Sequence, residues 1–157
     1  MKKVRLITDG ACKGNPGPGG WAAILRYNEH TRELYGSEPH TTNNRMELTA
    51  AVQGLAALKE ACEVEIVTDS EYLKNGITQW MPRWKRTGWT TTTKTPVKNQ
   101  DLWMALDEQV TRHRVDWKWT KGHAYDADNN RADELASQAA IDRTSSEAAV
   151  PAGKQIK

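Results

Sequence analysis

The sequence lacks the features that mark several large protein classes. It has two cysteines, Cys12 and Cys62, with no CxxC pair and no Cys/His spacing typical of a zinc site. A disulfide framework is therefore disfavoured, and free thiols in a reducing compartment are expected. No apolar run approaches the length of a membrane span, and the start, MKKVRLITDG, has too short an apolar run for a signal peptide. We expect a cytoplasmic protein that contacts no membrane.

Phenylalanine is absent as well, but other apolar residues take its place. The chain has seven tryptophans and 38% hydrophobic residues, which is compatible with a compact fold rather than a disordered chain. Its 157 residues fit one domain with a single core. The last residues, TSSEAAVPAGKQIK, lack periodicity. We expect a monomer with one folded domain over residues 1–142 and a disordered tail over residues 143–157.

Acidic residues are missing from one long window, residues 72–100, which contains six basic residues. Because the whole chain carries a net charge of +2, the rest of the chain sums to −4. Trp80, Trp84 and Trp89 interleave with these cations. The window predicts a localised contact surface for a polyanion, although tryptophans that pack a helix and solvated cations are the simpler alternative. The six cations are Lys74, Arg83, Lys85, Arg86, Lys94 and Lys98.

The hydrophobic periodicity predicts a mixed α/β fold. Strands are expected over residues 4–12, 21–27, 31–35, 63–68 and 115–120. Helices are expected from residue 43 to about 62, over residues 70–80 with an end near Pro82, over residues 101–113, and after the polar loop that ends at residue 130. Three strands followed by alternating helices and strands indicate a mixed sheet with helices packed on its faces. In such sheets, strand ends and helix starts converge on ligand sites.

An aspartate, Asp9, follows the apolar start of the first expected strand. Asp9-Gly10 could form a hairpin turn. However, the glycines and prolines of residues 14–20 already supply a turn, which we expect to be wide and to lie beside a site. This run lacks the Gly-Lys-Ser/Thr of a phosphate-binding loop and leads into a strand, which also argues against a dinucleotide fingerprint.

Two further acids lie where an expected helix begins. Glu47 is a candidate site residue, but it could also close a capping box that starts at Asn44. Asp69 ends the strand EIVTD just before a helix and could be its N-cap, a role that Ser70 could fill equally well. Taken singly, neither residue decides between function and capping.

A fourth acid, Asp133, lies beside the apolar positions of the last expected helix. It could be a solvated acid that the helix dipole favours. His123, in the loop KGHA, could be an ordinary surface residue or could assist proton transfer or product release near a carboxylate cluster.

Six ordered segments together resemble bacterial ribonuclease H, type 1, over residues 3 to about 142. They are TDGACKGNPGPGGWAA, TTNNRMELTAA, IVTDSEYLKNGITQW, TPVKNQDLW, KWTKGHA and NNRADELA. The resemblance implies a ribonuclease H-like α/β fold, a five-stranded mixed sheet with helices on both faces. It also implies an endonuclease that hydrolyses the RNA strand of RNA/DNA hybrids and leaves 5′-phosphate and 3′-hydroxyl ends. A non-catalytic hybrid-binding module and another metal nuclease of this fold remain the alternatives.

The resemblance assigns roles to the four acids and to the histidine. Asp9, Glu47, Asp69 and Asp133 match the family's catalytic carboxylates, which hold two Mg²⁺ ions with substrate, and Mn²⁺ is an alternative ion. Such a donor set fits the preference of hard cations for oxygen ligands, and two-metal sites place their ions about 3.5–4 Å apart. His123 matches an auxiliary catalytic residue of a family loop.

The resemblance also assigns substrate contacts, because hybrids are recognised through groove shape, 2′-hydroxyls and phosphates. Glu71 stands where related bacterial sequences often have Gln. Residues 80–99 resemble the basic handle of many bacterial members. The implied contacts are Asn15, Asn43 and Asn44 in the minor groove, Thr42 at a DNA phosphate, Glu71, Lys121, and Trp80, Trp84, Lys85, Arg86, Trp89, Lys94 and Lys98 of the handle.

Overall fold

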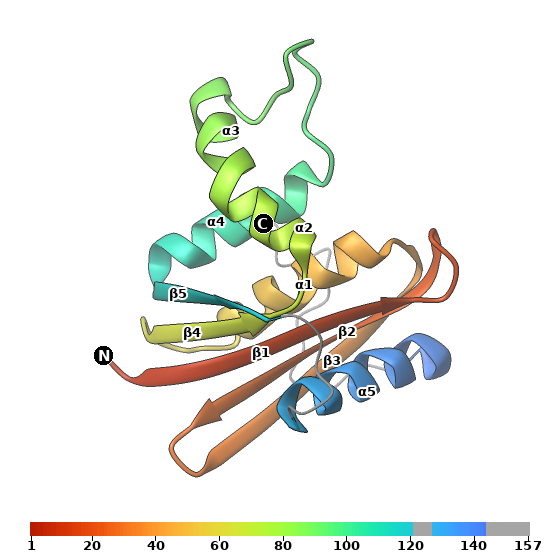
Figure 1. Cartoon of the computed structure of the whole chain (residues 1–157), viewed down its shortest axis with the longest axis vertical. Helices are drawn as coiled ribbons and strands as arrows, with labels where there is room; N and C mark the ends of the chain where they lie inside the picture. The colour runs from red at the N-terminus through yellow and green to blue at the C-terminus, as the bar shows by residue number, and fades with distance from the viewer. Residues whose placement is uncertain (121–126, 144–157) are drawn as a thin grey trace.

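A five-stranded mixed sheet forms the centre of the protein in this computed structural model, which describes residues 1–120 and 127–143 (Figure 1). The strand order is β3-β2-β1-β4-β5, with antiparallel pairing of β1–β2 and β2–β3 and parallel pairing of β1–β4 and β4–β5. The predicted sheet is thereby confirmed. The strands are β1 Lys3–Cys12, β2 Gly17–Tyr27, β3 His30–Thr41, β4 Glu63–Thr68 and β5 Arg114–Trp119.

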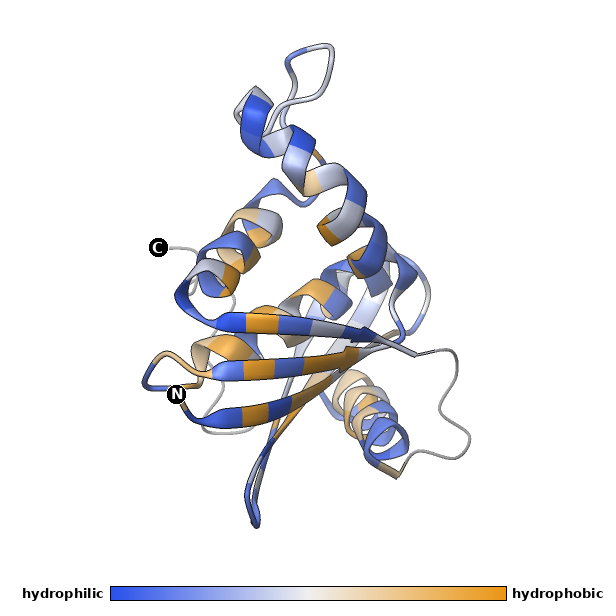
Figure 2. Ribbon diagram, turned by 60° about the vertical axis from the view of Figure 1, so that its left-hand side comes forward, coloured by the Kyte–Doolittle hydropathy of each residue, from blue (hydrophilic) through white to orange (hydrophobic). Residues whose placement is uncertain are grey.

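Helices cover both faces of this sheet (Figures 1 and 2). Among the helices of the described residues, α5 covers one face, against β1 and β2, while α1 and α4 lie on the other. A projecting arm of α3 and the loop after it extends beyond α4 (Figure 1). The helices are α1 Asn43–Ala56, α2 Glu71–Asn75, the π-helical turn η1 Gly76–Trp80, α3 Met81–Thr87, α4 Gln100–Arg112 and α5 Ala127–Asp142.

The central strands are apolar on both faces because each face is covered. Leu6 and Ile66 belong to the larger core with α1 and α4, whereas Ile7 and Val67 belong to a smaller core with α5. Successive residues of a strand point to opposite faces, so neighbouring residues of β1 and β4 contribute to both cores. Figure 2 shows hydrophobic stretches, in orange, midway along the strands.

The expected wide glycine turn is shorter than the sequence indicated. β2 begins at Gly17 rather than at residue 21, and Gly19 and Gly20 pair with the end of β1. A Cβ on Gly20 would lie 2.2 Å from Ala136 O and 2.6 Å from Ala140 N of α5. These glycines therefore serve helix–sheet packing, and they extend the strand instead of interrupting it.

The helix expected to end near Pro82 continues to Thr87 through the π-helical turn. The amide of Met81 bonds Gly76 O, five residues back, and Pro82 then falls in the first turn of α3. A proline is tolerated there because the first amides of a helix need no intrahelical acceptor. A Cβ on Gly76 would also overlap the Trp103 ring, so this turn packs directly on α4.

Three other element boundaries differ from the predictions by more than one residue. β3 extends to Thr41, because its polar second half pairs with the glycines of β2. α5 begins at residue 127, earlier than expected. α1 ends at Ala56 instead of near residue 62, and the Arg112 guanidinium of α4 donates to the carbonyl oxygens of Leu55 and Leu58. This tertiary cap satisfies carbonyls that a longer helix would have bonded internally.

Within residues 1–120 and 127–143, no helix has the length and apolar character needed to cross a membrane. The predicted tail, from residue 144 onward, lies outside the described residues.

The close approach of α5 to Gly20 leads to a stability prediction. Gly20→Ala should lower the free energy of unfolding by about 2–3 kcal/mol, because a methyl group would collide with helix backbone that cannot rotate away. Gly88→Ala is the matched comparison: its site is open but its φ is +69°, so we expect a loss of about 1–2 kcal/mol. Urea unfolding measures both, and equal losses would contradict the packing role of Gly20.

Candidate active site

Three carboxylates from separate elements converge at one edge of the sheet. Asp9 lies on β1, Glu47 on α1, and Asp69 directly after β4. One oxygen of each side chain lies within 4.8 Å of the other two. Asp9 and Glu47 are buried, with 6% and 5% of their surfaces exposed. The predicted convergence of these three acids is present in the structure.

Gly10 permits this convergence. A Cβ at Gly10 would lie 2.7 Å from Glu47 N, so α1 can approach β1 because the residue has no side chain. The Gly10 amide donates to Asp9 Oδ1 at 2.9 Å and to Glu47 Oε1 at 3.2 Å. Asp9 and Gly10 both pair with β2, so they are part of a strand and the hairpin-turn alternative is excluded.

Other residues perform the capping functions that could have explained the acids. The N-cap of α1 is Thr42, whose hydroxyl accepts the Arg45 amide at 3.2 Å, so the capping box starting at Asn44 is not formed. The N-cap of α2 is Ser70, whose hydroxyl accepts the Leu73 amide at 3.1 Å. Glu47 and Asp69 are therefore available to the carboxylate cluster.

The cluster is electrostatically strained without a cation. Burial, followed by the negative charges of Asp9 and Asp69, raises the pKa of Glu47 well above its ordinary value. No N–H or hydroxyl donor of the described residues reaches the buried Glu47 Oε2. Oxygen ligands with an unsatisfied acceptor and excess negative charge fit a hard divalent cation such as Mg²⁺.

Asp133 faces the same site from α5. It is exposed and lines a cavity of about 440 Å³ together with the three clustered acids. The side chains of all four predicted carboxylates thus line one cavity. The carboxylate oxygens that lie within 4.8 Å of one another belong to Asp9, Glu47 and Asp69. The remaining lining residues are Gly10, Asn43, Asn44, Ser70, Glu71 and Tyr72.

The predicted substrate contacts near this cavity have different positions. Asn43, Asn44 and Glu71 line it directly. Asn15 lies beside the start of α1, where its Oδ1 accepts the Asn43 amide at 3.0 Å, and Thr42 caps the same helix. Lys121 and His123 lie outside the described residues.

The handle is built on an aromatic cluster. Trp80 and Trp84 contact each other and Trp103, and Trp84 also contacts Trp89. All three predicted handle tryptophans are half-buried and pack against the larger core, so they support the arm structurally.

The charges of the handle are less uniform in space than in sequence. Lys85 forms an ion pair with Asp107 of α4 at 3.2 Å, which supplies a compensating acid from outside the acid-free window. Arg86, Lys94 and Lys98 are exposed. The sequence window therefore overstated the free positive charge, because it could not reveal an acid brought in by folding.

Tyr72 and Arg45 were missed by the sequence reasoning. The Tyr72 hydroxyl accepts from Asn99 at 2.9 Å and from the Trp103 indole at 3.0 Å, so this cavity-lining residue joins the site to the base of the handle. Arg45 forms two hydrogen bonds to Asp101, at 3.0 and 2.8 Å. In the sequence, Tyr72 directly follows Glu71, and Arg45 lies two residues before Glu47. This closeness to candidate site residues was the signal that could have found them.

Comparison with known proteins identifies the family. The RNase H family model matches residues 1–141. The chain is 66% identical over 146 residues to the ribonuclease H of Solibacter usitatus, covering 93% of this chain and 100% of that protein. The chain belongs to the RNase H family. Ribonuclease HI of Pseudomonas aeruginosa is 61% identical over 137 residues, covering 87% of this chain and 93% of the relative.

Solved structures of the family have the same architecture. LC9-RNase H1, described as a type 1 RNase H with the type 2 active-site motif, matches with a TM-score of 0.85 and 33% identity, covering 96% of this chain and 77% of that one. LC11-RNase H1, solved in complex with an RNA/DNA hybrid, matches with a TM-score of 0.65 and 22% identity, covering 88% of this chain and 97% of that one. At 22% identity, the likeness to LC11-RNase H1 shows only that the fold is shared.

The repulsion within the cluster leads to a second prediction, on the metal-free protein. Because the folded state binds the Glu47 proton more tightly than the unfolded state, the free energy of unfolding falls as the pH rises above about 4.5. Asp9→Asn removes one repelling charge and should stabilise the metal-free protein by about 1–2 kcal/mol near pH 7. Chemical denaturation in EDTA measures this gain.

The gain should shrink as the pH falls toward the ordinary pKa of a glutamate, because Glu47 is then protonated in both proteins and no longer repels its neighbours. It should also shrink when Mg²⁺ is added, since the ion neutralises the wild-type cluster. Glu29→Gln, at an exposed turn, is the control and should change little. A destabilised Asp9→Asn protein near neutral pH would contradict net repulsion in the cluster.

Proposed function

We propose that this protein hydrolyses the RNA strand of RNA/DNA hybrids endonucleolytically, leaving 5′-phosphate and 3′-hydroxyl ends. One observation carries the proposal: in a chain of the RNase H family, four carboxylates surround a single cavity, and three of them lie within 4.8 Å of one another. Such an arrangement is costly to fold and is typical of metal-dependent phosphoryl chemistry.

Asp9, Glu47, Asp69 and Asp133 would hold two Mg²⁺ ions, with Mn²⁺ as an alternative. When bound, the ions supply a water nucleophile and stabilise the leaving oxygen. The protein's own contribution is to hold these carboxylates in position around one cavity. Gly10 supports this through its amide, which orients one oxygen each of Asp9 and Glu47. His123 is the auxiliary residue of the proposal, and loss of its imidazole should slow the reaction without abolishing it.

Substrate contacts extend from the cavity to the handle. Asn43, Asn44 and Glu71 line the cavity and would meet the minor groove, with Asn15 and Thr42 beside them. Lys121 is proposed to touch a phosphate near the site. The exposed cations of the handle would neutralise phosphates farther along the duplex. The hybrid bound by LC11-RNase H1, a protein of the same fold, supports this substrate class.

The proposal also covers the extent of the catalytic domain, the oligomeric state and the cellular location. Residues 1–142 would form the catalytic domain with its handle at about 80–99, and residues 143–157 would form a tail outside it. The family match ends at residue 141 and α5 ends at Asp142, which supports this division. A monomer is proposed because one chain supplies all four carboxylates. A cytoplasmic location is proposed because Cys12 and Cys62 are free thiols, which are typical of a reducing compartment.

The cleavage assay is the third prediction. The wild type should cut the RNA of a labelled hybrid and leave double-stranded RNA and double-stranded DNA largely uncut, with Mg²⁺ required and EDTA abolishing the reaction. Asp9→Asn should reduce kcat by about a thousandfold or more, since it removes a buried oxygen ligand. Gel analysis of end-labelled products measures both activity and end chemistry.

The alternatives predict other outcomes of this assay. A non-catalytic hybrid-binding module would bind the hybrid equally well with and without Asp9→Asn and would cut nothing. Another metal nuclease of this fold would cut double-stranded DNA. Cleavage that persists in EDTA would contradict the metal-dependent mechanism.

The fourth prediction concerns the handle. Arg86→Gln with Lys98→Gln should raise KM for the hybrid several-fold, leave kcat nearly unchanged, and reduce the slope of log KM against log salt by about 0.9 for each lost phosphate contact. Lys85→Gln should have a smaller effect, because Lys85 is already paired with Asp107. Initial rates over a salt series test this. Equal effects of Lys85→Gln and the double variant, or an unchanged salt slope, would argue against phosphate contacts by the exposed cations.

A further inference from the structure

The helix that carries Asp133 rests on the sheet through small side chains. Ala132, Ala136, Ala139 and Ala140 of α5 are buried, and Ala136 and Ala140 lie against Gly20. Such a surface permits close approach, but it has few protruding groups that interlock. The Gly20 contact seats the C-terminal half of α5, whereas Asp133 lies in the N-terminal half.

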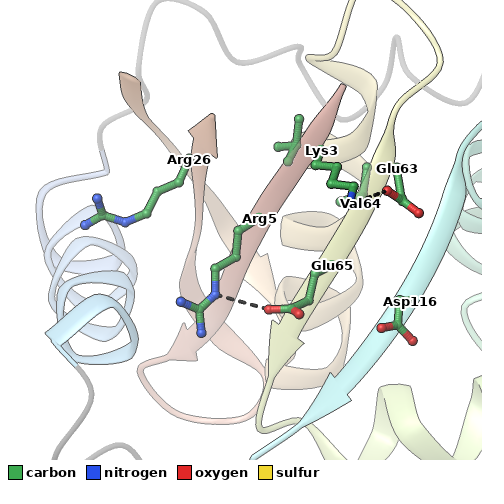
Figure 3. Close-up of a pocket in the computed structure, with 8 residues that line it drawn as sticks. Lys3, Arg5, Arg26, Glu63, Val64, Glu65 and Asp116 are labelled. Atoms are coloured by element: carbon green, nitrogen blue, oxygen red, sulfur yellow. Dashed lines mark ion pairs between the residues drawn. The ribbon is translucent and has the colours of Figure 1, made fainter. Parts of the chain in front are cut away.

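Two ion pairs connect that N-terminal half to the sheet. Arg26 of β2 donates to both carboxylate oxygens of Asp128, at 2.8 and 2.5 Å. Arg131 donates to both carboxylate oxygens of Glu33 on β3, at 2.8 and 3.1 Å. Paired hydrogen bonds of this kind restrict orientation as well as distance, because the planar guanidinium matches the carboxylate. Figure 3 shows Arg26 directed toward α5, while Arg5 on the neighbouring strand contacts Glu65 within the sheet.

The two ion pairs are arranged in opposite senses across the helix–sheet contact. Both can form together only when the helix is in one position. The sheet contributes the cation to the first pair and the anion to the second. Asp128 and Arg131 are three residues apart, so they lie on one side of α5, about 4.5 Å apart along its axis. A displacement of α5 by about one turn would bring Arg131 toward Arg26, and like charges would then oppose it.

We infer that the ion pairs Arg131–Glu33 and Arg26–Asp128 hold Asp133 where it can bind a metal ion. The four residues of these pairs are therefore positioning residues. Asp133 is two residues from Arg131 and five from Asp128 along the same helix, so both pairs control how that helix is rotated and placed. Ligand–metal distances in a metal site lie within about 0.2 Å of their usual values, so the placement of the helix that carries Asp133 matters for binding. Asn129, which donates to the Thr120 hydroxyl at 3.5 Å, adds a weaker tie at the start of α5.

This inference rests on the proposed role of Asp133 as a metal ligand, and the experiment separates the two. The variants are Glu33→Gln, Arg131→Gln, the corresponding double variant and Asp133→Asn. Glu65→Gln is the matched control, because it breaks the Arg5–Glu65 pair on the same sheet without touching α5, at similar exposure of the glutamate side chain, 37% against 33% for Glu33. Each protein is analysed for Mg²⁺ dependence of hybrid cleavage, for Mg²⁺ binding by calorimetry, and for hydrogen exchange of the α5 amides.

Glu33→Gln and Arg131→Gln should each raise the Mg²⁺ concentration for half-maximal activity by about tenfold, the lower end of the usual cost of losing a ligand-orienting partner. KM for the hybrid at saturating Mg²⁺ should stay within about twofold, since neither residue lines the cavity. Mg²⁺ binding should weaken in parallel, and α5 amides should exchange faster. The double variant should match Arg131→Gln, because Arg131→Gln already removes the pair with Glu33, together with a second ion pair from Arg131 to Glu134.

Equal Mg²⁺ midpoints for Glu33→Gln and Glu65→Gln would overturn the inference, as would additive effects in the double variant. A raised KM with unchanged metal dependence would also overturn it, since that result indicates general damage to substrate binding. If the wild type fails to cut the hybrid, the proposed function fails, while calorimetry and hydrogen exchange still decide whether the pairs control metal binding. If Asp133→Asn leaves Mg²⁺ binding unchanged, Asp133 is no ligand and the inference falls with that premise.

Discussion

Repulsion between buried carboxylates is the constraint on which the rest of this structure depends. Asp9, Glu47 and Asp69 lie within 4.8 Å of one another, and burial together with the neighbouring charges raises the pKa of Glu47. Isolated charges in such a place are costly, so the surrounding fold must supply the stability that the cluster subtracts. Apolar cores on both faces of the sheet do so. A divalent cation that binds this cluster would neutralise the repulsion and raise the free energy of unfolding.

Glycine determines how closely the helices can bring their acids to the sheet. Gly10 allows α1 to approach β1, and Gly20 allows α5 to lie against β2, so the helices that bear Glu47 and Asp133 each depend on a missing side chain. These contacts set the distance between helix and strand. Ion pairs between Arg and carboxylate then add directional control over α5. Close packing and directional pairing together can place ligands more tightly than either alone.

The handle illustrates a different division of roles. Its tryptophans pack on one another and on Trp103, and this aromatic cluster supports an arm that carries exposed cations. Tyr72 joins that cluster to the active-site cavity through hydrogen bonds from Asn99 and Trp103. The carboxylate cavity and the exposed cations of the handle are therefore connected through one framework, although these charges are separated along the chain.

The sequence by itself determined the sheet, the order of its elements and four acids at strand ends and helix starts, because apolar periodicity and side-chain chemistry are local properties. Only the tertiary structure decided the structural parts played by the glycines of β2, Pro82 and Lys85. The sequence predicts a turn at the glycines of β2, but in the structure they pair with β1 and α5 packs on Gly20. Pro82 is predicted to end a helix, but a π-helical turn places it in the first turn of α3. Lys85 is predicted to be a free cation, but it forms an ion pair with Asp107. In each case the deciding partner is distant in sequence or depends on a backbone geometry that periodicity does not encode.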